Sequence, residues 1–212
     1  MLNTFFKSLL LGLVLTTTVQ AQTIDQTDPY VMIEQVAHKL LTNYRDQQEA
    51  IAADPLVLRT LVETDLMPYV NSTYAAYKVM GTALRSATDE QKQAFTNAFR
   101  EYMITTFAQA FSVYSDQSIT YEPSRPVGDR SIISVKVIFV EGNRPPIEVQ
   151  FKMRLNKNNG QWQAIDLAAE GASILAAKES EFAGLIRQRG LDAVIRMLEE
   201  RNQQVLAGGD AS

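Results

Sequence analysis

The residues of this chain that could act in acid–base or nucleophilic catalysis are few. His38 is the only histidine and the chain has no cysteine, so neither a histidine-rich nor a thiolate metal site can form. Asp166 and Glu170 could act as a general acid and base, although a carboxylate at a strand end and a hydrogen-bond acceptor in a loop are the simpler interpretation. Gly171-Ala172-Ser173 is half of a nucleophile elbow, but the second glycine is missing and no histidine follows it in the chain.

Motifs that bind nucleotides are also missing from the sequence. It contains no glycine-rich phosphate loop and no dinucleotide fingerprint, so it shows no means of using ATP. The chain is acidic, with a formal net charge of −4. An acidic chain is a poor partner for nucleic acid or for an anionic membrane surface. The kind of function that remains is the binding of an apolar ligand or partner by apolar side chains.

Long rows of apolar residues are the feature that could provide such a binding surface. Two stretches alternate large apolar residues with polar ones, which is the period of strands with one dry face. The apolar members are Ile133, Val135, Val137 and Phe139 in the first stretch, and Ile147, Val149, Phe151, Met153 and Leu155 in the second. The glycine- and proline-containing segment 141–146 predicts a hairpin connection between them. A third strand is expected around Trp162, after the turn 156–160, and an earlier one at 119–121.

Helices are predicted before these strands. Asp28-Pro29 and Asp54-Pro55 each indicate an N-cap followed by proline in the first helical turn, and Gly81 indicates the C-cap of a later helix. Thr88-Asp89-Glu90-Gln91 is a capping box that opens the longest helix, expected over 89–114. Its apolar face is rich in aromatic residues and comprises Phe95, Ala98, Phe99, Tyr102, Met103, Phe107, Ala110, Phe111 and Tyr114.

The order of these elements predicts the fold class. Helices come first, then the strands, and then two more helices separated by Gly190, which is the order of an α+β domain. The apolar face of the sheet needs a cover, and the helices are available to provide it. We expect helices wrapped around a bent, mostly antiparallel sheet of about four strands that encloses an apolar pocket, although the alternation alone fits a filled core equally well.

The first residues of the chain, 1–21, predict a signal peptide. A lysine precedes a short apolar run over 9–15, and Val19-Gln20-Ala21 provides a small-residue cleavage site. The run is too short to span a bilayer, and without cysteine the chain cannot carry a lipoprotein anchor. We therefore expect an exported, periplasmic protein with a single domain over 22–202 and a flexible tail over 203–212.

Several short stretches resemble the MlaC family, whose members are also known as toluene-tolerance or periplasmic phospholipid-binding proteins. Each stretch is weak alone, but their order and spacing cover nearly the whole chain after the signal peptide. The stretches are Asp25-Gln26-Thr27-Asp28-Pro29-Tyr30, Leu66-Met67-Pro68-Tyr69-Val70, Gly81 followed by Ala87-Thr88, Gln91, Phe95 and Phe99-Arg100-Glu101-Tyr102, then Trp162-Gln163-Ala164 and Ala169-Glu170-Gly171-Ala172-Ser173.

The resemblance implies a periplasmic shuttle that holds phospholipid acyl chains in an apolar pocket beneath a bent antiparallel sheet. It implies exchange of lipid with an outer-membrane lipoprotein–porin complex and with an inner-membrane ABC transporter bearing an MCE-domain protein. The family role is to keep phospholipid out of the outer leaflet, which maintains outer-membrane lipid asymmetry. We expect a monomer with no cofactor, no nucleic-acid partner and no enzymatic activity.

Most of the candidate lipid-binding residues come from the apolar rows, from the aromatic face of the long helix and from the family stretches. We place Val135, Val137, Phe139, Val149, Phe151 and Met153 on the concave face of the sheet, opposite Phe99, Tyr102, Met103 and Phe107 of the long helix. The other candidates are Leu66, Met67, Tyr69, Val70, Tyr74 and Trp162. No catalytic residue and no metal ligand is assigned.

Two other functions stay open at the level of the sequence. One is a small exported hydrolase or isomerase on a cone-shaped α+β fold that uses Asp166 or Glu170. The other is a periplasmic adaptor or chaperone that buries its apolar face against protein. A diacyl lipid extracted in stoichiometric amount favours the carrier, whereas an empty, well-packed domain favours the adaptor.

Overall fold

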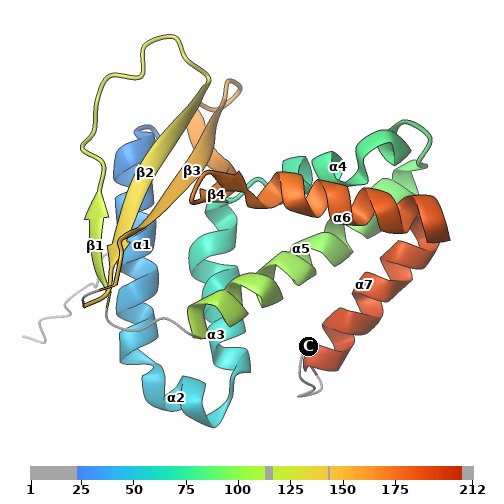
Figure 1. Ribbon diagram of the computed structural model, residues 1–212, viewed down its shortest axis with the longest axis horizontal. Coiled ribbons are helices and arrows are strands. Elements are labelled where there is room, and N and C mark those ends of the chain that lie inside the picture. Colours follow the sequence, from blue (N-terminus) through green and yellow to red (C-terminus); the bar gives the residue numbers. More distant parts are fainter. Residues whose placement is uncertain (1–22, 113–116, 143, 207–212) are drawn as a thin grey trace, which may run out of the picture.

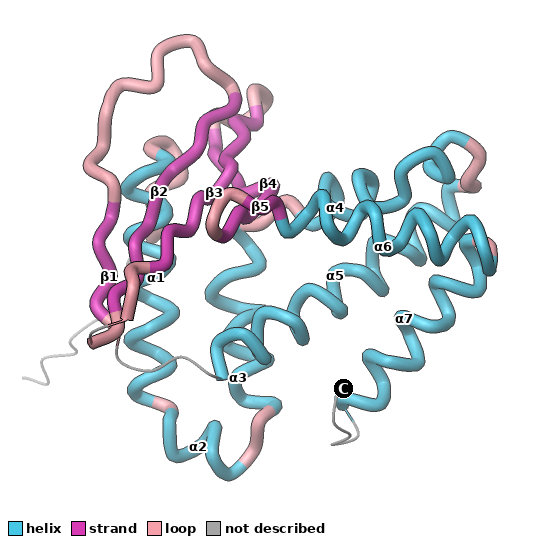
Figure 2. The backbone as a smooth tube through the Cα atoms, in the orientation of Figure 1, coloured by secondary structure: helices cyan, strands magenta, loops and turns pink. Residues whose placement is uncertain are grey.

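The computed structural model describes residues 23–112, 117–142 and 144–206. Within these residues the chain forms seven α-helices and one five-stranded antiparallel sheet (Figures 1 and 2). The predicted signal peptide lies outside the described residues. The last helix continues through Leu206, so the predicted boundary of the tail at 203 falls within regular structure, and residues 207–212 lie outside the described part.

Helices precede and follow the strands in the sequence. The helices are α1 (Pro29–Asp46), α2 (Gln48–Ala53), α3 (Leu56–Leu61), α4 (Ser72–Met80), α5 (Asp89–Ser112), α6 (Ile174–Arg189) and α7 (Leu191–Leu206), with a π turn η1 (Val62–Leu66) and 3-10 turns η2 (Met67–Tyr69) and η3 (Gly81–Arg85). The strands are β1 (Ser118–Tyr121), β2 (Ile132–Val140), β3 (Ile147–Asn156), β4 (Gln161–Ala169) and β5 (Ala172–Ser173).

Local start and stop signals position the helix ends as the sequence predicts. The Asp28 carboxylate accepts hydrogen bonds from the first N–H groups of α1. Thr88 and Gln91 exchange two bonds, of 3.0 and 3.2 Å, in a capping box before α5. Gly81 and Gly190 end α4 and α6 with positive φ angles of 55° and 80°, a conformation that glycine adopts without strain.

The sheet keeps its strands in sequence order, each antiparallel to the next. Val135 pairs with Phe151 and Val137 pairs with Val149, so the two predicted apolar rows share one face. The sequence predicted about four strands, and the fifth is the two-residue β5, which is too short to show alternation. Glu170 and Gly171, at φ angles of 50° and 82°, form the tight hairpin turn that leads to it.

The helices form two groups around the sheet (Figure 1). Helix α1 lies along the sheet, where Tyr30 and Met32 share a buried cluster with residues of β2, β3 and β4. Helices α4, α6 and α7 pack around the first half of α5, whose Phe95 and Phe99 contact Phe182 of α6. The long helix is therefore not a uniform cover for the sheet. Phe95 and Phe99 pack in a second core, which α5 forms with α4, α6 and α7. Residues farther along α5, such as Met103 and Phe107, line the cavity beside the sheet.

Candidate binding cavity

A cavity of about 640 Å³ lies between the sheet and the helices, within the size range of ligand sites in proteins. Its walls come from α1, the η1–η2 segment, the second half of α5, the sheet and the first turns of α6. Nearly all of the surface is apolar. The members contributed by α1, β1 and the start of α6, which the candidate list lacked, include Met32, Ile33, Val36, Leu40, Ile119, Tyr121, Ile174 and Leu175.

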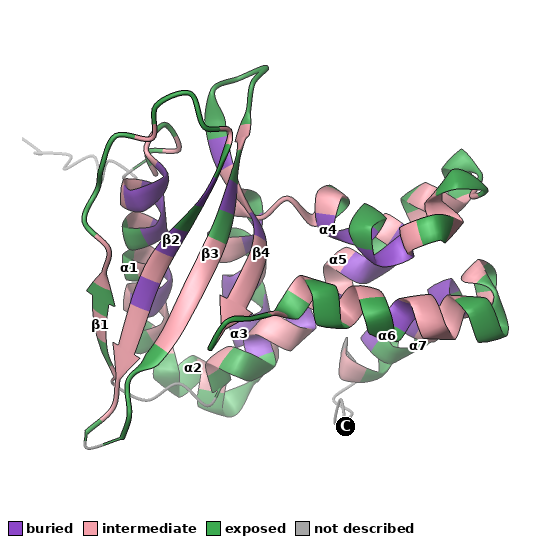
Figure 3. Cartoon of the chain, turned by 45° about the horizontal axis from the view of Figure 1, so that its top comes forward, coloured by how far each residue is buried: buried purple, intermediate pink, exposed green. Residues whose placement is uncertain are grey.

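The cavity exists because the apolar face of the sheet is covered over only part of its length. Near one end, Ile133, Val135 and Met153 are fully buried against α1. Phe151, which pairs with Val135 across the two strands, is only half-buried, and toward the other end Ile147 is 49% exposed. Figure 3 shows this change along β2 and β3, from buried to intermediate and exposed. The closed half of the sheet comprises Ile133, Val135, Met153 and Trp162. The open half comprises Val137, Phe139, Ile147, Val149 and Phe151, which line the cavity.

Eleven of the sixteen candidate residues line the cavity. From the helical side these are Leu66, Tyr69, Val70, Phe99, Tyr102, Met103 and Phe107, and from the sheet Val137, Phe139, Val149 and Phe151. Residues as far apart in the sequence as Leu66 and Phe151 thus share one apolar surface.

The other five candidates lie outside the cavity lining. Val135, Met153 and Trp162 belong to the closed half, where α1 already covers them. Met67 packs between α1, α3 and α5, and Tyr74 lies on α4 with the Arg154 guanidinium 5.4 Å from the centre of its ring. Periodicity placed the strand residues on the correct face, but it carries no information on where along that face the cover ends.

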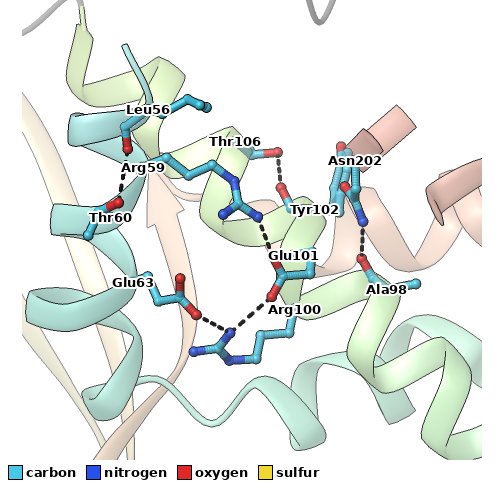
Figure 4. Close-up of polar contacts among 10 residues, drawn as sticks. All are labelled: Leu56, Arg59, Thr60, Glu63, Ala98, Arg100, Glu101, Tyr102, Thr106 and Asn202. Carbon is cyan, nitrogen blue, oxygen red and sulfur yellow. Dashed lines mark hydrogen bonds and ion pairs between the residues drawn. The ribbon is translucent and has the colours of Figure 1, made fainter. Parts of the chain in front are cut away.

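Ion pairs outside the cavity hold α3 and the π turn η1 to the middle of α5. The guanidinium of Arg59, which is buried, pairs with Glu101 of α5. Arg100 bridges Glu63 at 2.9 Å and Glu101 at 3.1 Å, as Figure 4 shows. These contacts fix η1 against α5, and Leu66 at the end of η1 and Tyr69 at the end of η2 line the cavity.

A second polar contact holds η1 to α1. The buried carboxylate of Asp65 pairs with the Lys39 amine at 2.9 Å and accepts a hydrogen bond of 2.6 Å from the Asn43 side chain. A π turn is a rare element that is often found near functional sites. Here it is anchored on two sides, so the distance between α1 and α5, the two helical walls of the cavity, is fixed by side-chain contacts.

Asp166 and Ser173 form hydrogen bonds that cap the start of α6. The Asp166 carboxylate accepts hydrogen bonds from the Ser173 hydroxyl at 2.7 Å and from the Leu175 N–H at 3.1 Å. The Ser173 hydroxyl also accepts from the Ala176 N–H, which makes it the N-cap of α6. Asp166 follows a bulge at Ile165, the extra residue between the β3–β4 pairs Lys152–Asp166 and Met153–Ala164.

One basic side chain, Lys178 of α6, lies at the cavity with most of its length covered. Its amine is 2.7 Å from the Glu181 carboxylate and 5.4 Å from the centre of the Tyr102 ring. Burial lowers the pKa of Lys178, but the interactions with Glu181 and Tyr102 outweigh it and raise the pKa above its ordinary value. The raised pKa means that the amine stays charged throughout the physiological pH range.

Other chemistry has little support in the described residues. His38 is exposed on α1, and the described residues contain no cluster of three His, Asp or Glu side chains that could hold a metal ion. None of the described helices combines the length and the apolar character needed to cross a bilayer.

Comparison with known proteins identifies relatives across most of the chain. Residues 34–200 match the model of the family described as MlaC protein. The intermembrane phospholipid transport system binding protein MlaC of Haemophilus influenzae is 35% identical over 182 residues, which is 85% of each chain. The toluene tolerance protein ttg2D of Pseudomonas putida is 24% identical over 177 residues, 82% of this chain and 78% of that protein.

A solved structure has the same fold. It is the phospholipid-binding protein from Ralstonia solanacearum, determined in complex with a phospholipid. The TM-score is 0.73 at 21% sequence identity, over 84% of this chain and 99% of that one. The predicted α+β architecture is therefore confirmed.

Proposed function

Since this chain belongs to the MlaC family, we propose that it is a periplasmic phospholipid carrier, which moves lipid between the outer and inner membranes and so maintains the lipid asymmetry of the outer membrane. The observation that carries this proposal is the apolar cavity beneath the open half of the sheet. The names of the relatives, an intermembrane phospholipid transport protein and a phospholipid-binding protein, support the same function.

The energetics of acyl chains explain why such a carrier needs this cavity. Each buried methylene is worth about 0.8 kcal/mol, so two ordinary acyl chains carry on the order of 20 kcal/mol. A lipid cannot leave a bilayer for water at a useful rate against a cost of that size. A cavity about as apolar as the bilayer makes loading nearly neutral, and the lipid then crosses the aqueous space inside the protein.

We propose that the acyl chains contact the open half of the sheet and the facing helices. Val149 and Phe151 would form one wall, and Met103 and Phe107 the other, because all four line the cavity. The five candidates outside the lining would then be structural residues of the closed half and of the helical core.

The partners proposed for this carrier follow from the family. They are an inner-membrane ABC transporter with an MCE-domain protein and an outer-membrane lipoprotein–porin complex. We propose that lipid passes by docking to these complexes. The protein itself would have no enzymatic activity, because the candidate group Asp166 is engaged with Ser173 in capping α6 and the other candidate, Glu170, is exposed in the β4–β5 turn.

Lipid extraction followed by transfer tests the proposal. The mature protein, purified without detergent, is extracted with organic solvent and the extract is analysed by mass spectrometry. We expect a phospholipid in at least stoichiometric amount, and we expect the protein to move a fluorescent phospholipid from donor to acceptor vesicles. A protein that yields no lipid and moves none would support the adaptor, and hydrolysis of the added lipid would support the enzyme.

A further inference from the structure

Two basic residues are among those that line the cavity, and they differ in position. Arg144 belongs to the β2–β3 connection, and its side chain is 76% exposed and paired with Glu141. Lys178 has only 28% of its side chain exposed. Its ammonium group therefore lies at the boundary between the apolar interior and water, which is where the polar end of a lipid would lie when its acyl chains fill the cavity.

The neighbours of Lys178 leave it able to bind a further acceptor. A lysine ammonium carries three N–H donors. Glu181 accepts one of them at 2.7 Å, and the centre of the Tyr102 ring lies 5.4 Å from the amine. Tyr102 also lines the cavity, so these contacts keep the amine on the cavity side of α6.

Other groups near this position are already engaged. The N–H groups of Leu175 and Ala176 at the start of α6 donate to Asp166 and Ser173. Asp166 itself lines the cavity, but one of its carboxylate oxygens accepts from the Leu175 N–H and the other from the Ser173 hydroxyl. Glu181 is half-exposed and does not line the cavity. Lys178 is therefore the group at this position best placed to meet an anion.

We propose that Lys178 binds the phosphate of the lipid, and that it thereby selects phospholipids over neutral lipids with the same acyl chains. This inference rests on the proposed carrier function. The phosphate is common to all phospholipids, so one lysine can distinguish phospholipid from diacylglycerol without distinguishing one head group from another. A hydrogen bond to an ionised group is stronger than a neutral one, and its direction is not restricted for an ammonium.

The test compares lipid uptake from mixed vesicles. The vesicles contain equal amounts of phosphatidylethanolamine, phosphatidylglycerol and diacylglycerol with identical acyl chains, and the lipid bound to the re-isolated protein is measured by mass spectrometry. For the parent protein we expect phospholipid enriched over diacylglycerol by about tenfold, the effect of one charge-assisted hydrogen bond at a partly exposed position. Lys178→Met should reduce the enrichment to nearly the vesicle ratio, and Lys178→Arg should retain most of it.

Lys78 provides a matched control. It lies on α4, pairs with Glu179 of α6 at 3.6 Å, and is not among the cavity-lining residues. Lys78→Met removes the same charge from a lysine that also pairs with a glutamate of α6, and should leave the enrichment unchanged. If Lys78→Met and Lys178→Met lower it equally, the general charge of the surface and not a phosphate contact is responsible, and the inference is wrong.

The remaining outcomes separate this inference from the proposed function. Equal uptake of phospholipid and diacylglycerol by the parent would overturn the role of Lys178 but leave the carrier function standing. No uptake of any lipid would overturn the carrier function itself. A second arm adds excess inorganic phosphate, which competes for the same ammonium group and should lower the enrichment more than sodium chloride does at equal ionic strength. An equal effect of the two salts would mean that phosphate does not compete at Lys178, and would contradict the inference.

Discussion

The closed and open halves of the sheet differ in what covers them and not in their residue pattern. Val135 and Val149 are the same residue type, lie on the same face and stand on adjacent strands. Val135 is 1% exposed beneath α1, whereas Val149 faces the cavity. The same alternation of apolar and polar residues therefore faces a filled core in one part of the sheet and a cavity in the other. The difference arises where α1 meets the sheet: Tyr30 shares a buried cluster with the closed half and does not line the cavity, whereas Met32, Ile33 and Val36 also line the cavity.

Matched glutamate substitutions should separate the two halves most strongly. Val135→Glu places an unpaired carboxylate in a sealed core, and we expect it to lower the free energy of unfolding by about 4 kcal/mol or more. Val149→Glu meets a cavity that water can enter when no lipid is bound, so the protein should fold. Its carboxylate would face acyl chains when lipid is present, and the amount of bound lipid should fall by about tenfold or more.

Denaturant unfolding and lipid extraction measure both variants. The comparison fails if the two substitutions destabilise the protein equally while Val149→Glu keeps its lipid, since the open half would then be an ordinary core.

Truncation of aromatic residues should give the next largest difference. Trp162→Ala empties a fully buried site in the closed half and should cost about 3–5 kcal/mol. Phe151→Ala enlarges a cavity that already exists. The cost should be below about 2 kcal/mol, because the half-buried Phe151 side chain loses less buried apolar surface than Trp162 does. Thermal and denaturant unfolding of the lipid-free proteins provide the test. Equal costs would mean that Phe151 is as tightly enclosed as Trp162.

The Asp166 cap should contribute less than either core. Asp166→Asn keeps one side-chain oxygen as an acceptor but loses the charge, and we expect a loss of about 1 kcal/mol in the free energy of unfolding. Lipid transfer should remain largely intact because no lipid contact is removed. A folded variant that loads lipid but does not transfer it would instead indicate that the start of α6 takes part in docking.

Glu170 should have the smallest effect. It is exposed in the β4–β5 turn, and Glu170→Gln should change the free energy of unfolding by no more than about 0.5 kcal/mol and leave lipid transfer unchanged. A folded Glu170→Gln protein that loses a measurable hydrolytic activity would revive the enzymatic alternative.

Local features of the fold could be predicted from the sequence because their causes are local. The Asp28 cap, the capping box at Thr88 and the alternation around Val149 each depend on residues within a few positions. The same holds for the glycines that end α4 and α6. The family resemblance could likewise be recognised from short stretches such as Ala169-Glu170-Gly171-Ala172-Ser173, whose function in the structure is a tight turn and a helix cap.

The cavity boundary could not be predicted, because it depends on contacts between distant segments. Phe99 and Tyr102 were expected to face the sheet, and they do line the cavity, but they also pack against Phe182 of α6. No periodic signal marks the point at which a long helix passes from one core to another. Lys178 carried no signal either, since a lysine on a helix is ordinarily solvated.

Photo-crosslinking tests most directly whether acyl chains occupy the open half of the sheet. A phospholipid with a diazirine at the end of one acyl chain is loaded into the protein, irradiated, and the labelled residues are identified by peptide mass spectrometry. We predict labels on cavity-lining residues such as Phe107 and Phe151 and none on Trp162 or Met153, which α1 covers. Labels confined to the outer surface, or shared by the closed half, would contradict the assignment of the cavity as the lipid site.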